Sequence, residues 1–239
     1  MRRLVEAFVL YSDALKELFF PRHCIVCGDA LPAGQRDLCA RCREDLPLTY
    51  FWDWVQNPAF ERITKYVQIE SAASLFFFRE EAGYNHILHA IKYGGNTSLG
   101  YELGSEFGAF LLDSPGFAGI DAVVPVPLHR LRRFRRGYNQ AEVIASGIAS
   151  SLGIPLVTNI VQRVKRTGTQ TRLHGSEKKK NVEGAFSANE FHAKKMAGNG
   201  TGHILLVDDV LTSGATLSEC AKQLTPYFKV SVVSLSFVE

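Results

Sequence analysis

The pattern of apolar and polar residues changes near residue 70 of the chain. Beyond it, short apolar runs alternate with stretches in which apolar residues recur every three or four positions, as on a helix face. The runs predict strands at 72–78, 121–127, 155–161, 203–210 and 229–238, and the helical spacing predicts helices at 83–92, 99–112, 139–152 and 216–224. Strands that alternate with helices indicate an α/β fold with a mainly parallel sheet flanked by helices.

The first 70 residues follow other patterns. Helical spacing predicts an N-terminal amphipathic helix, in which Glu6 interrupts the apolar run and no secretory cleavage site follows. Both tryptophans of the chain lie in an aromatic segment that we interpret as a linker packed on its neighbours. We therefore expect four parts: the amphipathic helix (1–20), a cysteine-rich module (21–48), the linker (49–69) and the α/β domain (70–239).

Composition places the chain among ordinary globular proteins. Its 239 residues are 46% hydrophobic and 21% charged, which is enough to bury a sizeable core. No apolar run is long enough for a membrane span, so we expect a cytoplasmic protein. The formal net charge of +3 says nothing about nucleic acid, and the local clustering of basic residues is more informative.

Four of the five cysteines form two C-x2-C pairs separated by eleven residues: Cys24, Cys27, Cys39 and Cys42. Two such pairs supply four thiolates for a tetrahedral zinc site, which a full ligand shell makes structural. An iron–sulfur cluster is an alternative, and disulfides are disfavoured because nothing in the sequence indicates export. Cys220 lies among apolar residues of a predicted helix, where we expect core packing.

The stretch "VDDVLTSGAT" joins the strand predicted at 203–210 to the helix after it. In open α/β sheets ligands bind beyond the carboxyl ends of strands, where Asp208 and Asp209 are expected. The small residues that follow open a helix whose N-terminal N–H groups attract an anion. A ligand with vicinal hydroxyls beside a phosphate, such as a ribose 5-phosphate, fits both features, whereas a turn with an N-cap needs no ligand. The candidate ligand-binding residues are Asp208, Asp209, Val210, Leu211, Thr212, Ser213, Gly214, Ala215 and Thr216.

A second strand end is strongly basic, with five arginines between residues 130 and 136. Arginine binds phosphate groups through two parallel hydrogen bonds, so one interpretation is a diphosphate site that also takes Mg²⁺. The aromatic residues Phe134 and Tyr138 favour a second interpretation, a contact with single-stranded nucleic acid. A solvated cationic face is the third alternative.

The combined motifs resemble the ComF family (ComFC- and GntX-like proteins). "VDDVLTSGAT" resembles the phosphoribosyl diphosphate (PRPP) motif of type I phosphoribosyltransferases. "PLHRLRRFRRGYNQ" is similar to the family pattern P-L-H-x-x-R-x-x-x-R-G-F/Y-N-Q, and "LFFPRHCIVCG", "IKYGG" and "RTGTQTRLHGSEKKKNVEGAF" resemble other family motifs. The chain departs from the family at 178–180, where lysines replace arginines, at Gly95, and at 168–169, which lack the usual prolines.

This resemblance implies a type I phosphoribosyltransferase-like domain with a four-cysteine zinc finger. It implies that Asp208 and Asp209 bind the ribose hydroxyls and that residues 211–216 bind the 5′-phosphate. It further implies a role in DNA uptake during natural transformation, with single-stranded DNA and competence-machinery proteins such as a DNA helicase as partners.

Two classes of function stay open. The first is a phosphoribosyltransferase that breaks the C1–diphosphate bond of PRPP through an oxocarbenium-like state, by orienting the substrates and stabilising the diphosphate. The basic stretch 163–183 would then act as a lid. The second is a non-catalytic PRPP sensor that binds single-stranded DNA or protein. No acceptor pocket is evident from the sequence. The candidate catalytic residues, acting with Mg²⁺, are Asp208, Asp209, Lys92, Arg132 and Arg136.

Overall fold

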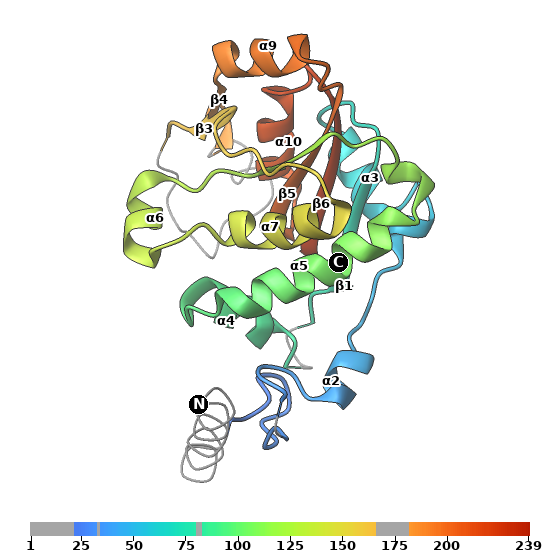
Figure 1. The fold of residues 1–239 in the computed structure, drawn as a ribbon, viewed down its shortest axis with the longest axis vertical. Helices are drawn as coiled ribbons and strands as arrows, with labels where there is room; N and C mark the ends of the chain where they lie inside the picture. The colour runs from blue at the N-terminus through green and yellow to red at the C-terminus, as the bar shows by residue number, and fades with distance from the viewer. Residues whose placement is uncertain (1–21, 33, 80–82, 166–181) are drawn as a thin grey trace, which may run out of the picture.

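The computed structural model describes residues 22–32, 34–79, 83–165 and 182–239. The amphipathic helix expected at 1–20 lies outside the described residues, as do most of the basic stretch 163–183 and its lysines at 178–180. Figure 1 shows a sheet surrounded by helices, with a small cysteine-rich module at one end.

A parallel sheet of four strands forms the centre of the larger domain. Its strand order is β1-β6-β5-β2, and every neighbouring pair is parallel, which confirms the expected α/β fold. All carboxyl ends therefore lie at one edge, where ligands bind in such folds. The strands are β1 (Ala72–Phe77), β2 (Ala122–Pro125), β5 (His203–Leu211) and β6 (Lys229–Phe237).

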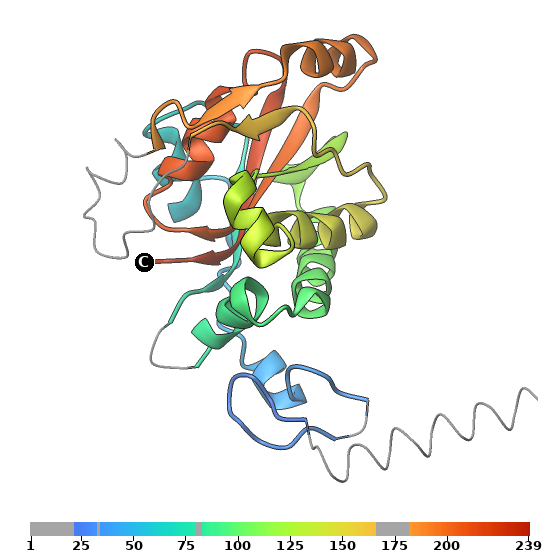
Figure 2. The same ribbon diagram turned by 90° about the vertical axis from the view of Figure 1, so that its left-hand side faces the viewer.

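Helices cover both faces of this sheet, and Figure 2 shows α5 and α7 on one side and α3 and α10 on the other. Helices α5 and α7 approach closely because glycines lie where they touch. A Cβ atom on Gly104 would lie 2.3 Å from the Ile144 carbonyl oxygen, and one on Gly147 would lie 2.2 Å from that of Tyr101. The helices that match the predicted ones are α4 (Asn85–Tyr93), α5 (Thr97–Leu112), α7 (Gln140–Leu152) and α10 (Ala215–Lys222).

The segment 49–69, expected to be a packed linker, contains regular structure. It forms the short helix η1 (Phe51–Asp53) and helix α3 (Pro58–Thr64). Asn57 explains why the chain turns here, because its side-chain oxygen caps α3 by accepting from Phe60 N at 2.9 Å. Its amide nitrogen donates to the Phe51 carbonyl at 2.9 Å and to the Ala72 carbonyl at 2.7 Å. One buried side chain thus fastens η1 and α3 to the edge strand β1.

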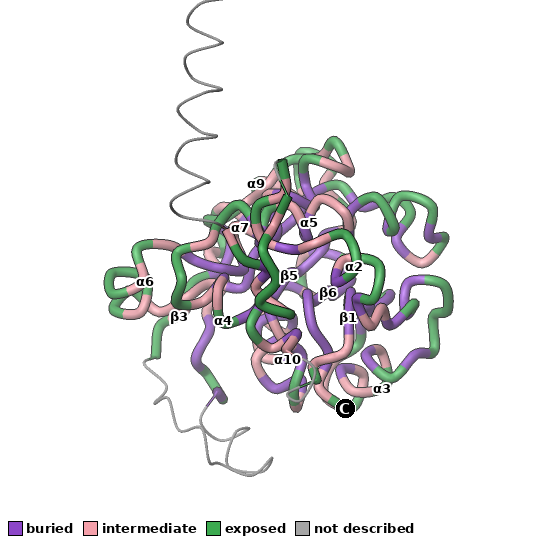
Figure 3. Tube along the Cα trace, turned by 90° about the horizontal axis from the view of Figure 1, so that it is seen from below, coloured by how far each residue is buried: buried purple, intermediate pink, exposed green. Residues whose placement is uncertain are grey.

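The structure corrects two expectations between the main strands. The strand expected at 155–161 is wrong: Leu156 makes only a single parallel bridge with Val123, and the next strand starts at residue 161. The basic segment 130–136, which the sequence showed only as a strand end, is a helix, and its residues are largely exposed (Figure 3). Between β2 and β5, the described elements that were not predicted are α6 (Arg130–Arg136), β3 (Val161–Arg163), β4 (Phe186–Ala188) and α9 (Glu190–Gly198), and β3 pairs antiparallel with β4.

The cysteine-rich module, which contains α2 (Ala40–Glu44), packs against the start of α4 and α5. Tyr84, at the beginning of α4, donates its hydroxyl to the Asp45 carbonyl at 2.8 Å. Asn96, which follows α4, donates to the Asp37 carboxylate, and Arg43 pairs with Glu102 on α5 at 3.2 Å. The module therefore holds α4 at both of its ends.

In the part of the chain that the structure describes, no helix is both long enough and apolar enough to cross a lipid bilayer.

Candidate functional site

Two adjacent acids occupy the carboxyl end of β5, as the sequence predicts. Asp208 and Asp209 are only 8% and 7% exposed, and the four residues before them are fully buried. Asp208 lies opposite Ser234 of β6, so the pair sits between central strands of the sheet. The Asp208 side chain accepts a hydrogen bond from the Asp209 backbone N–H at 2.9 Å. The Asp208 carboxylate is thus held by the backbone of its own strand.

Burial makes it costly to ionise both acids together. It is the largest cause that raises the pKa of Asp208 to about 8, and the negative charge of Asp209 adds to it. The Asp209 N–H, Lys92 and Arg163 oppose this shift in pKa. The site therefore favours any ligand that brings a cation or hydrogen-bond donors to the pair.

Lys92 reaches the acids from the last turn of α4. Its Nζ lies 3.1 Å from Asp209 Oδ2, and its side chain is only 25% exposed. A contact from the turn between α6 and α7 helps to fix this end of the helix, since Tyr138 donates its hydroxyl to the Ile91 carbonyl. The structure thus brings together two candidate residues that lie far apart in the sequence.

One carboxylate oxygen of the pair remains without a hydrogen bond. Asp209 Oδ2 is buried, and although Lys92 Nζ is within ion-pair distance, the contact lacks hydrogen-bond geometry. Buried polar atoms in native proteins almost always have a partner, so an exception needs an explanation. A ligand hydroxyl that donates to this oxygen would satisfy it.

The loop after β5 has the form expected of an anion cradle. Gly214 adopts φ +78°, which favours glycine, and it is the N-cap of α10. Glycine has no side chain to accept from the first-turn N–H groups, so these groups are available to an anion. The helix then begins at Ala215, inside the predicted segment 211–216.

The candidate arginines of α6 differ in their surroundings. The positive charge of Arg132 lowers the pKa of Arg163, after the larger effect of burial, so the two guanidinium groups lie near each other. Arg136 donates to the Gln140 side chain, and its guanidinium lies 5.1 Å from the centre of the Tyr93 ring. Arg132 therefore acts electrostatically on Arg163, whereas Arg136 packs α6 against α4 and α7.

Two arginines at this edge are not among the site residues predicted from the sequence. Arg163 of β3 lies 5.2 Å above the Phe186 ring, and its charge opposes the raised pKa of Asp208. Arg62 of α3 donates to the Thr212 carbonyl at 2.7 Å. Arg163 stood at the start of a basic stretch and was a detectable candidate, whereas Arg62 lay in the expected linker without any local signal.

The four cysteines of the N-terminal module form one cluster. Their Sγ atoms all lie within 4.8 Å of one another. Tetrahedral zinc with Zn–S bonds of ~2.3 Å requires sulfur separations of about 3.8 Å, and the Sγ atoms of Cys27 and Cys39 are 3.8 Å apart. Burial opposes ionisation of Cys24, but surrounding backbone N–H groups lower the pKa of this thiol to about 6. The cluster thus suits a structural zinc ion and would leave no ligand position open for catalysis.

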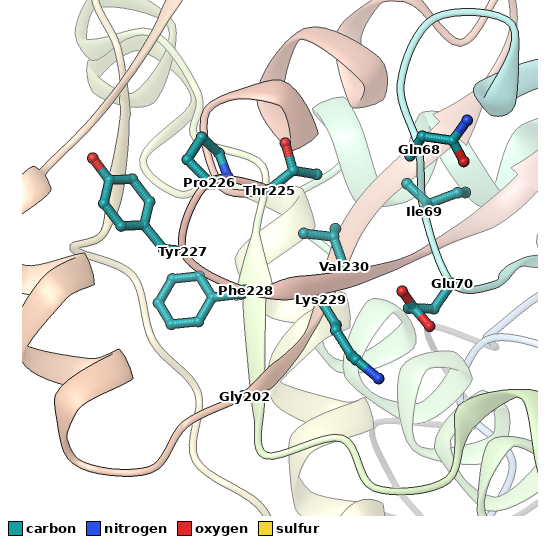
Figure 4. Close-up of a pocket in the computed structure, with 10 residues that line it drawn as sticks. All are labelled: Gln68, Ile69, Glu70, Gly202, Thr225, Pro226, Tyr227, Phe228, Lys229 and Val230. Carbon is teal, nitrogen blue, oxygen red and sulfur yellow. The ribbon is translucent and has the colours of Figure 1, made fainter.

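A separate cavity of about 550 Å³ opens at the other end of the sheet (Figure 4). Glu70, Gly202 and Lys229 line it, and Lys229 starts β6. Since Asp208 lies near the opposite end of the same strands, this cavity is not part of the acidic site.

Comparison with known proteins gives one family match and several relatives. Residues 15–50 match the double zinc ribbon domain. The chain is 43% identical over 108 residues to competence protein F of Haemophilus influenzae, covering 44% of each chain. It is 27% identical over 205 residues to the DNA utilization protein YhgH of Salmonella typhi, covering 84% of this chain and 77% of the relative.

Two further comparisons are shorter or weaker. Competence protein ComFC of Bacillus subtilis is 32% identical over 114 residues, or 47% of this chain and 41% of the relative. A solved glutamine PRPP amidotransferase from B. subtilis aligns with a TM-score of 0.34 and 20% identity, covering 56% of this chain and 26% of that one. This structural similarity is too low to support an argument. The matched segments span less than half the length of competence protein F and of ComFC.

Zinc content tests the cysteine cluster. We expect the purified protein to hold about one zinc ion per chain, because the described residues contain one such cluster. Cys39→Ser should lose the metal and lower the melting temperature. Cys220→Ser, at a buried cysteine outside the cluster, should keep the metal. Elemental analysis measures the content, and equal zinc in both variants would contradict the assignment.

The acid pair predicts an unusual pH dependence of stability. Because the pKa of Asp208 is raised to about 8 in the folded state, its contribution to stability is present at low pH and is lost as pH rises towards 8. We expect Asp208→Asn to unfold with a free energy on the order of 2 kcal/mol higher than wild type at pH 8, and with a smaller gain at pH 5. Urea unfolding without ligand measures this, with Asp113→Asn at an exposed site as control. A gain that does not vary with pH would show that Asp208 titrates normally.

Proposed function

We propose that this chain, which belongs to the ComF family, binds PRPP together with Mg²⁺ at the carboxyl edge of its sheet. The observation that carries the proposal is the buried Asp209 Oδ2, which has a cation nearby but no hydrogen-bond donor. Vicinal ribose hydroxyls would donate to the two carboxylates. This interaction would remove the cost of an unsatisfied buried acceptor.

Each part of PRPP has a counterpart at this edge. The uncapped start of α10 suits the 5′-phosphate, because its N–H groups and helix dipole favour negative charge. The charge of Arg163 opposes the raised pKa of Asp208, and Arg132 acts on Arg163 in turn, so both would supply positive charge for the diphosphate. Lys92, whose Nζ lies 3.1 Å from Asp209 Oδ2, completes the cationic surroundings.

These residues suit transfer of the phosphoribosyl group to an acceptor. Breaking the C1–diphosphate bond needs orientation of the sugar and stabilisation of the departing anion more than a nucleophilic side chain. The carboxylates would orient the ribose, and Lys92, Arg132 and Arg163 would stabilise negative charge. Mg²⁺, when bound with the diphosphate, would neutralise part of that charge. The same residues would serve a PRPP sensor that carries out no transfer.

The relatives indicate the process in which the protein acts. Two are named competence proteins, and a relative that aligns over 205 residues is named a DNA utilization protein. We infer a role in DNA uptake during natural transformation, on the cytoplasmic side. Single-stranded DNA and proteins of the uptake machinery, such as a DNA helicase, are the proposed partners.

Helix α6 favours single-stranded DNA binding as a second function. Phe134 is 87% exposed and lies on the same short helix as five arginines. An exposed aromatic ring among cations can stack on a base while the cations follow the phosphates. A ring exposed to this extent buries little apolar surface, so it contributes little to the stability of the fold.

PRPP binding is tested by thermal unfolding with Mg²⁺ present. At a PRPP concentration a hundredfold above Kd, we expect about 2.7 kcal/mol of added stability, or a rise in Tm of ~5–10 °C. The double variant Asp208→Asn, Asp209→Asn should lose this rise. The matched double variant Asp53→Asn, Asp113→Asn neutralises two exposed acids and should keep it. An unchanged rise in the first double variant would disprove the site.

DNA binding is tested with a fluorescent single-stranded oligonucleotide. We expect Phe134→Ala to weaken binding about 5- to 100-fold, as the loss of one stacked base predicts. Phe191→Ala removes a ring that is 72% exposed on α9, and it should leave binding unchanged. Affinity should also fall steeply with salt. Equal effects of the two substitutions, or binding that does not depend on salt, would argue against α6.

A further inference from the structure

We propose that Arg62 is a positioning residue for the 5′-phosphate cradle. It lies on α3, in the segment that the sequence suggested was a linker, and it does not belong to any motif of the PRPP site. This inference rests on the proposed function, because it concerns how the loop after β5 obtains its binding geometry.

A single nitrogen of Arg62 joins the loop to the end of the sheet. Arg62 Nη1 donates to the Thr212 carbonyl at 2.7 Å and also to the Val238 carbonyl. Val238 N in turn donates to the Leu211 carbonyl at 3.0 Å. Val238, the residue that follows β6, is therefore joined to two consecutive loop residues. It bonds directly to Leu211, and it is linked to Thr212 through Arg62.

The bond to Thr212 decides which way the next N–H group points. In a trans peptide unit the carbonyl and the following N–H point in opposite directions. Because Arg62 holds the Thr212 carbonyl on the α3 side, the Ser213 N–H points to the other side of the loop. That N–H belongs to the run that would meet the phosphate, so Arg62 orients a donor without contacting the ligand.

Packing around the bond leaves the loop little room to move. Gly214 lies so close to α3 that an added Cβ would be 3.2 Å from Ile63 Cδ1. The Arg62 guanidinium is also 4.1 Å from the centre of the Phe237 ring, and burial lowers the pKa of Arg62. The Arg62 side chain therefore lies against Phe237 of the sheet, and its own helix, α3, packs against Gly214 of the loop.

The charge of Arg62 points to the same role. Among the described residues, no carboxylate lies within ion-pair distance of it, and its partners are carbonyl oxygens and an aromatic ring. A cation whose charge is not neutralised by the protein raises the electrostatic attraction of this loop for an anion. The direction of the Ser213 N–H and the positive charge of Arg62 thus both favour a phosphate group at residues 212–216.

The test compares two ligands that use different halves of the site. PRPP needs the 5′-phosphate cradle, whereas Mg²⁺–diphosphate would need only the cationic side near Arg132 and Arg163. We expect Arg62→Met to raise the Kd for PRPP about tenfold or more and to change the Kd for Mg²⁺–diphosphate less than about twofold. Isothermal titration calorimetry measures both constants on the full chain.

Lys65→Met is the matched control, because it removes an exposed positive charge three residues away without touching the loop. It should leave both Kd values unchanged. If Arg62→Met does not fold, Arg62→Lys, which retains the charge but not the planar fork, is judged by the same ratio of the two constants. Equal weakening of both ligands, or no weakening, overturns the role of Arg62. Wild-type protein that does not bind PRPP would overturn the proposed function itself, which is a different result.

Discussion

Two adjacent carboxylates buried at the end of a central strand are the constraint on which this edge of the sheet depends. The fully buried residues before Asp208 anchor β5 in the core, so the acids cannot swing into water. Removing charges from water costs several kcal/mol unless partners offset it. The partners come from three separate elements: Lys92 from α4, Arg163 from β3 and the backbone N–H of Asp209 from β5 itself. A hydrophobic pair at the same place would cost less free energy of folding. Ligand binding is therefore the natural explanation for the two acids.

The sequence was most informative where the chemistry is local. The two C-x2-C pairs and the run from Asp208 to Thr216 each place their functional groups within a few residues, so spacing alone predicts the zinc cluster and the strand–loop–helix. Arg62 could not be predicted in this way, because its partner Thr212 is 150 positions away. The strand expected at 155–161 was wrong for a related reason, since a short apolar run beside a sheet does not show whether it pairs. Helix α6 was missed because five of its seven residues are arginines, and its two apolar residues, Leu131 and Phe134, are too few to show a helical pattern.

The zinc module contributes to the site although it lies outside it. Helix α4 carries Lys92, and the module contacts the chain at both ends of that helix, through Tyr84 and Asn96. A module of this size has little core of its own, so the metal would supply much of its folding free energy. Metal binding in one domain would thereby help to set the position of a cation that faces the acid pair in the other. The docking contacts from Arg43 to α5 extend the same support to the next helix.

The two halves of the proposed site consist of different chemical groups, backbone N–H groups in one and cationic side chains in the other. This difference affects which ligands each half would recognise. The cradle around Gly214 uses backbone N–H groups and a glycine, with its shape fixed by Arg62 and α3. Such a cradle tolerates little variation in its ligand, so it suits a constant group such as a 5′-phosphate. The opposite half uses long cationic side chains, most of them exposed on α6. Flexible cations accept many arrangements of phosphate, including a diphosphate and a nucleic-acid strand. In the proposed function, the fixed half would recognise the sugar phosphate, and the adaptable half would leave room for DNA to meet the same edge of the sheet.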